Sequence, residues 1–172
     1  MIFQTFGPFR IRLDEYRNIP RKLEEFWAEV EEKISGLSDA KGCYLFGIKT
    51  SGGSWLCPWY VGKTIKSFRA ECFQPHKRDI YARSISHYKR ANPYLLLIAR
   101  LTAGGDLYKG TGTTSTDFLE KHLISLGIQA NPELQNSRDT KLYRELQLRG
   151  ILNSDGGKPD KATAELRLAL RL

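Results

Sequence analysis

Four stretches of the chain have a hydrophobic pattern that predicts a helix or a strand. Residues 21–34 carry apolar side chains at helical spacing with glutamates opposite, which predicts an amphipathic helix opened by Pro20. Two runs rich in aromatic and β-branched residues, 42–48 and 58–64, flank a loop with Gly and Ser and predict a β-hairpin. Tyr94 to Thr102 is almost continuously apolar, which is typical of a central strand covered on both faces.

The remaining segments predict further helices, and the N-terminal segment fits two interpretations. Met1 to Leu13 alternates loosely and is expected either to add an edge strand or to pack as an apolar arm. Thr116 is a residue type that commonly caps the start of a helix, and Gly127 is a residue type that commonly ends one. The expected helices after the hairpin span Asp79 to Arg90, Phe118 to Leu126 and Lys141 to Arg149, and Ala162 to Leu172 forms a marginal helix or a loose tail.

The predicted fold class is α/β (α+β), with a small three-stranded, mostly antiparallel sheet flanked by helices. A chain of 172 residues is long enough for one domain with a real core. The expected organisation is an N-terminal helical arm at residues 1–40, a central domain at residues 41–150 and a C-terminal tail at residues 151–172.

Charge and cysteine content narrow the class of protein. Lys and Arg outnumber Asp and Glu by 27 to 19, a formal charge of +8, which indicates a phosphate-bearing partner or simply a basic surface. Three cysteines without C-x-x-C spacing indicate neither a zinc knuckle nor a disulfide framework, and favour a reduced, cytoplasmic setting. No apolar run has the length of a membrane span, so no membrane partner is expected.

Each run of the predicted hairpin carries a tyrosine near a glycine, as Gly42-Cys43-Tyr44 and Tyr60-Val61-Gly62. A glycine at these points leaves backbone space for a phosphate or a tight turn. The two motifs, and the order hairpin, helix, strand, helix between Gly42 and Asn136, resemble the GIY-YIG nuclease family. The resemblance implies an endonuclease, a hydrolase that cuts DNA phosphodiester bonds with Mg²⁺ or Mn²⁺.

The resemblance also implies roles for particular residues. Tyr44 and Tyr60 would act around the water nucleophile, and Arg69 would steady the phosphate charge. Glu120, inside the helix after the buried strand, would bind the metal, since Mg²⁺ needs only one or two carboxylates. The alternative for Glu120 is a surface glutamate in an i,i+4 contact, and Asp117 is the second carboxylate candidate.

Further residues are candidates for substrate contacts. Lys63-Thr64 does not belong to a P-loop, because Cys57 stands where that motif needs glycine. Lys63 is expected instead to contact phosphate at the strand end. The cluster His76-Lys77-Arg78 competes with Arg69 as the source of cationic charge. Asn136 is favoured as a substrate contact over Asn131, which reads equally well as a turn residue.

Two other functions fit the same sequence. A nucleic-acid-binding module on this fold would bind without metal, and a protein-interaction protein would dock a partner on the acidic helix from Arg21 to Ile34. Aromatic residues are interleaved with a basic stretch that includes Lys89 and Arg90, a composition suited to base stacking, although helical spacing favours a core role for most of these rings. The sequence leaves DNA versus RNA and the oligomeric state open.

Overall fold

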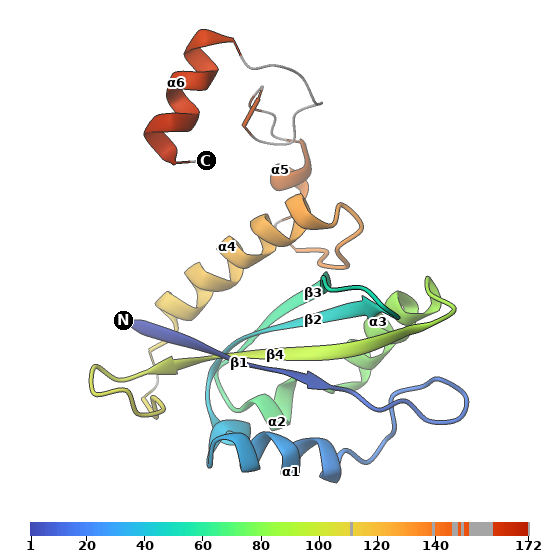
Figure 1. The fold of residues 1–172 in the computed structure, drawn as a ribbon. Coiled ribbons are helices and arrows are strands. Elements are labelled where there is room, and N and C mark those ends of the chain that lie inside the picture. Colours follow the sequence, from blue (N-terminus) through green and yellow to red (C-terminus); the bar gives the residue numbers. More distant parts are fainter. Residues whose placement is uncertain (111, 139, 146–147, 149, 152–159, 172) are drawn as a thin grey trace. The chain divides into compact units, whose positions relative to one another are not determined.

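The computed structural model covers residues 1–172 and describes all of them except 111, 139, 146–147, 149, 152–159 and 172. The chain separates into two compact units, residues 1–136 and residues 137–172. The elements of the first unit are β1 (Ile2–Arg10), α1 (Glu24–Lys33), the 3-10 turn η1 (Leu37–Asp39), β2 (Gly42–Thr50), β3 (Cys57–Thr64), α2 (Phe68–Glu71), α3 (Pro75–Ser86), β4 (Ala91–Leu101) and α4 (Thr114–Ala130) (Figure 1).

The sheet of the first unit has four antiparallel strands in the order β1-β4-β2-β3. The predicted mixed α/β class and antiparallel pairing are confirmed, but the expected number of three strands is wrong. The fourth strand is β1, which pairs along β4 and buries Phe6 and Phe9 in the core. Residues 1–40 therefore belong to the same compact unit as the hairpin, and that unit ends at residue 136 rather than at residue 150.

Helices cover both faces of this sheet, with α1 and α2 on one face and α4 on the other (Figure 1). The face toward α1, α2 and α3 is a continuous aromatic core. Phe46 of β2 stacks on Tyr81 of α3 with ring centroids 4.0 Å apart, and Phe73 contacts both Tyr81 and Phe26 of α1 edge-on. This packing holds α3 against the hairpin.

Helices α1 and α4 differ from their predicted bounds. Helix α1 begins at Glu24 rather than at Pro20, and Glu24 and Glu25 in its first turn complement the helix dipole. Helix α4 continues through Gly127 to Ala130. Leu134 packs over Gly127 and occupies the space that a side chain there would need, so the glycine serves packing within the helix. The N-cap position of α4 is Thr113 rather than Thr116.

Helix α3 begins at Pro75, four residues before its predicted start, with proline at the first helical position where its missing N–H costs nothing. It ends at Ser86 rather than at Arg90.

The second unit contains α5 (Thr140–Glu145) and α6 (Lys161–Leu170). The segment that the sequence assigns to a marginal helix or a tail is helical in its described part, where Asp160 caps α6 by accepting a hydrogen bond from the N–H of Thr163. The predicted helix from Lys141 to Arg149 is helical up to Glu145, and residues 146, 147 and 149 lie outside the described residues. Among the described helices, none has the length and apolar character needed to cross a membrane.

Candidate active site

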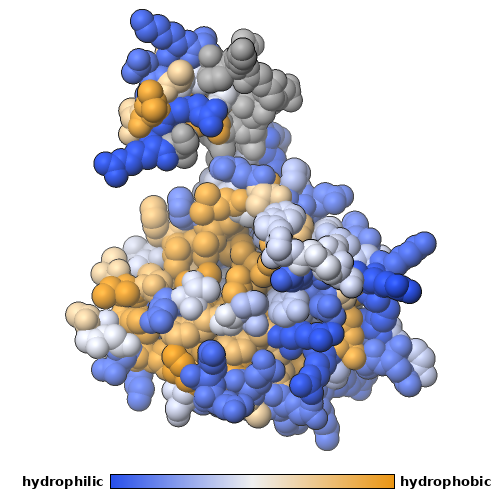
Figure 2. Space-filling view, viewed as in Figure 1, coloured by the Kyte–Doolittle hydropathy of each residue, from blue (hydrophilic) through white to orange (hydrophobic). Residues whose placement is uncertain are grey.

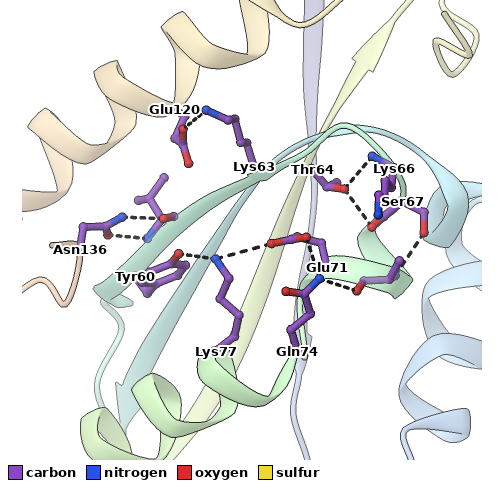
Figure 3. Close-up of polar contacts among 12 residues, drawn as sticks. Tyr60, Lys63, Thr64, Lys66, Ser67, Glu71, Gln74, Lys77, Glu120 and Asn136 are labelled. Carbon is purple, nitrogen blue, oxygen red and sulfur yellow. Dashed lines mark hydrogen bonds and ion pairs between the residues drawn. The ribbon is translucent and has the colours of Figure 1, made fainter. Parts of the chain in front are cut away.

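Polar side chains form two clusters on opposite faces of the edge strand β3 (Figure 3). Tyr60 and Lys63 lie three residues apart on this strand, so their side chains point to opposite faces. On the face toward α2 and α3, the phenol cluster comprises Tyr60, Lys77 and Glu71. On the face toward α4, the carboxylate cluster comprises Lys63, Asp117 and Glu120.

The phenol cluster is organised by the buried ammonium group of Lys77. Lys77, in the first turn of α3, is only 7% exposed, and its Nζ donates to the phenol oxygen of Tyr60. The same Nζ lies 4.6 Å from the centre of the Tyr60 ring and 3.7 Å from Oε1 of Glu71. Glu71 is held in turn by Nε2 of Gln74 at 3.1 Å. A buried ammonium needs such partners, and here they fix it against the phenol oxygen.

The two tyrosines of the motifs differ sharply in accessibility. Tyr60 is partly exposed, whereas Tyr44 is fully buried and its hydroxyl has no hydrogen-bond partner among the described residues. Burial, and then the neighbouring Tyr81, raise the pKa of Tyr44 far above its ordinary value. Of the two phenols predicted to act around a water nucleophile, only that of Tyr60 is accessible to solvent.

The motif glycines have packing roles. A Cβ at Gly62 would overlap the ring and hydroxyl of Tyr44, so Gly62 makes room for that ring. A Cβ at Gly42 would overlap the carbonyl oxygen of Ile98 on β4, so Gly42 allows the two central strands to approach. Both glycines therefore serve backbone and ring packing.

The carboxylate cluster is centred on the ammonium group of Lys63. Its Nζ lies 2.7 Å from Oε2 of Glu120 and 2.9 Å from Oδ1 of Asp117, one turn apart on α4. Partial burial alone would lower the pKa of Lys63, but hydrogen bonds and attraction to Glu120 and Asp117 outweigh it, and the pKa is raised. Lys63 is therefore a charged ion-pair partner throughout the neutral pH range.

The buried thiol of Cys43 adjoins this cluster. Burial, and then the negative charge of Glu120, raise the pKa of Cys43 to about 12. The thiol donates to the carbonyl oxygen of Thr116 and stays protonated at neutral pH.

The donors of the carboxylate cluster suit a hard divalent cation. Asp117 and Glu120 supply carboxylate oxygens from one helix face, and Mg²⁺ is commonly held by one or two carboxylates. The described residues contain no group of three or more His, Cys, Asp or Glu side chains placed for a metal. The Lys63 ammonium occupies the point where the two carboxylates converge.

The other predicted cations lie apart from the Tyr60 phenol. Arg69 is exposed and sits over the ring of Trp27 on α1, 5.6 Å from its centroid. His76 is exposed in the first turn of α3. The guanidinium of Arg78 is used by the fold, since it donates to the carbonyl oxygens of Ile19, Pro20, Arg21 and Phe73. The cation at the phenol is therefore Lys77 rather than Arg69.

Asn136 binds the backbone of β3. Its Nδ2 donates to the carbonyl oxygen of Val61 at 2.7 Å, and its Oδ1 accepts from the Val61 N–H at 2.9 Å. Nδ2 of Asn131 donates to the carbonyl oxygen of Pro58 at 2.7 Å, so the segment after α4 runs along the sheet edge. Both amide atoms of Asn136 therefore cover the edge of β3, which protects an exposed strand from non-native pairing.

Sequence reasoning missed Glu71 and undervalued Asp117. The spacing of Asp117 and Glu120, three residues apart on a helix, is a signal that both side chains share one face. Glu71 meets Lys77 across the break between α2 and α3, and no local pattern predicts that contact.

Comparisons of the chain with protein-family models, curated proteins and solved structures find no match. The function is therefore inferred from the geometry of the described residues.

Proposed function

We propose that the chain is a metal-dependent endonuclease that hydrolyses nucleic-acid phosphodiester bonds beside β3. The observation that carries this proposal is the phenol oxygen of Tyr60, which is held by the buried ammonium of Lys77. Tyr60 lies on β3, the strand that also carries Lys63. The order of hairpin, helices, strand and helix supports a relationship to the GIY-YIG family, in which this chemistry is expected.

The phenol cluster orients the attacking water. The Tyr60 oxygen bonds the water, and Lys77 acts as a positioning residue by fixing that oxygen. The water oxygen forms a new bond to phosphorus while the bond from phosphorus to the leaving sugar oxygen breaks. The water releases one proton to solvent, and the leaving oxygen takes one up.

The carboxylate cluster supplies charge stabilisation. Asp117 and Glu120 would hold Mg²⁺ or Mn²⁺, which neutralises charge developing on the phosphate oxygens. Lys63, released from the two carboxylates, reaches the phosphate as a point charge.

The ion pairs of Lys63 also favour a second candidate, a nucleic-acid-binding module without cleavage. In that case Lys63 permanently replaces the metal, and the cluster serves only to hold α4 against β3. Binding would then be unaffected by EDTA and would survive Glu120→Gln.

Nicking of supercoiled plasmid and cleavage of a branched DNA distinguish the two candidates. The endonuclease should cut with Mg²⁺ or Mn²⁺ and not with EDTA. Glu120→Gln should lower the rate about 10- to 100-fold, because one of two metal ligands loses its charge. Glu29→Gln, at an exposed position of α1, is the control for charge removal and should cut normally. Absence of cutting by the wild type on both substrates and with both metals would leave the binding module as the function.

Direct binding of Mn²⁺, measured by the loss of its free-ion EPR signal, tests the metal site without activity. Lys63→Met should tighten binding about tenfold, because the competing ammonium is removed while the carboxylates remain. Combining Lys63→Met with Glu120→Gln should reverse the gain. Equal Mn²⁺ affinity in the wild type and Lys63→Met would place the metal site elsewhere.

A further inference from the structure

We propose that the chain binds single-stranded nucleic acid on a cationic platform, formed by Arg10, Tyr16, Arg17, Lys89 and Arg90, at the end of the sheet where β1 ends and β4 begins. All five side chains are exposed. The choice of nucleic acid as the ligand rests on the proposed function. The new elements are that this nucleic acid is single-stranded and that it binds a surface outside the candidate active site.

A tight, internally bonded loop holds the aromatic ring of the platform away from the core. Oδ1 of Asp14 accepts the N–H groups of Tyr16 at 3.0 Å and Asn18 at 2.7 Å, and the N–H of Asp14 donates to the Asn18 carbonyl at 2.9 Å. Arg17 adopts a left-handed backbone with φ of 64°. The loop leaves the Tyr16 side chain 77% exposed. A fixed loop that presents a bare ring provides a stacking surface at low entropic cost.

Side-chain contacts join this loop to the turn between α3 and β4. The guanidinium of Arg17 donates to the carbonyl oxygens of Lys89 at 2.6 Å and Tyr88 at 3.2 Å. Arg10 donates to Oδ1 of Asn92 at 2.6 Å. Cationic groups from two segments about 70 residues apart in sequence are thereby brought to one surface.

The net charge of this surface is positive. Residues 10–18 and 88–92 together contain five Lys and Arg against Asp14 and Glu15. The Asp14 carboxylate is engaged by its own loop, and Arg12 pairs with Glu25 of α1 at 3.2 Å. Figure 2 shows hydrophilic side chains covering this end of the molecule, while hydrophobic ones gather over α4 and the neighbouring sheet. Charge complementarity therefore selects a polyanion as the occupant.

The exposed ring selects a single strand among polyanions. Bases of a single strand stack on aromatic side chains while cations follow the backbone, whereas a duplex keeps the faces of its bases covered. Helix α3 runs from Lys77 of the phenol cluster to this platform, about 14 Å from residue 77 to residue 86 at 1.5 Å per residue. That distance corresponds to about four stacked nucleotides, so one strand can reach both places.

Fluorescence anisotropy with a labelled 20-nucleotide single strand in EDTA tests the platform in the full chain. The double variant Lys89→Glu with Arg90→Glu should weaken binding more than tenfold, and should reduce the steepness of log K against log salt by about 1.4. Tyr16→Ala should weaken binding about tenfold through the lost stacking contact. The matched control, Lys33→Glu with Lys109→Glu, reverses two exposed charges outside the platform and should bind within about threefold of the wild type.

Each other outcome overturns the inference. Equal weakening by the two double variants would show that only total charge matters. Unchanged binding by Tyr16→Ala, or equal competition by a duplex, would remove the single-strand assignment.

The test separates this inference from the proposed function, because EDTA excludes metal-dependent cleavage. Normal binding of the single strand by the platform variants, together with nicking of DNA by the wild type, would overturn only the proposed platform. Binding that depends on the platform residues, in a wild type that never nicks DNA, would overturn only the proposed endonuclease.

Discussion

Tyr60→Phe is expected to lower the rate of phosphodiester cleavage about 100-fold or more, whereas Tyr44→Phe should leave it unchanged. Loss of a group that orients or takes protons from the nucleophile commonly costs factors of 10² to 10⁴. Tyr60 is partly exposed with its oxygen held by Lys77, while the Tyr44 hydroxyl is buried beneath Gly62. Single-turnover cleavage with saturating Mn²⁺ measures the chemical step directly.

Unfolding by denaturant supplies the control for this pair of variants. Tyr44→Phe removes a buried hydroxyl that lacks a partner among the described residues, so the free energy of unfolding should stay constant or rise by about 1 kcal/mol. Tyr60→Phe leaves Glu71 beside Lys77 and should fold normally. A Tyr44→Phe protein that folds but does not cut would contradict the assignment of the water to Tyr60.

The sequence predicts the elements whose signals are local. The hairpin and the strand from Tyr94 to Thr102 follow from alternation and apolar runs, and the structure confirms both. Strand β1 has only loose alternation, because its core contacts are limited mainly to Phe6 and Phe9 while its other side chains face solvent. Its place in the sheet depends on pairing with β4, some 90 residues later.

The candidate site is less predictable because it depends on how deeply each side chain is buried and on which way each helix turns its side chains. Strand alternation puts Tyr44 and Tyr60 on one face, yet only Tyr44 is fully buried, and its neighbour Tyr81 on α3 lies far along the chain. A count of residues from Gly62 selects Arg69 as the phosphate-binding cation. The break between α2 and α3 resets the helical phase, so Lys77 faces Tyr60 and Arg69 faces α1.

Gly42→Ala is expected to cause the largest loss of stability, about 3 kcal/mol in the free energy of unfolding. The new Cβ would overlap the backbone carbonyl of Ile98, and a backbone atom between two central strands cannot move without separating β2 from β4. Gly42 also has φ of 155°, a value that disfavours side chains. Chemical denaturation followed by circular dichroism measures the loss.

Gly105→Ala separates backbone strain from steric overlap. Gly105 has φ of 92°, and a Cβ there would meet no described atom within 4 Å. This variant should lose only about 1 kcal/mol, the cost of a side chain at positive φ. The excess of about 2 kcal/mol at Gly42 then measures the close approach of β2 to β4. Equal losses at the two sites would mean that the strands yield to a methyl group, and the glycine of the first motif would again be free to serve a phosphate contact.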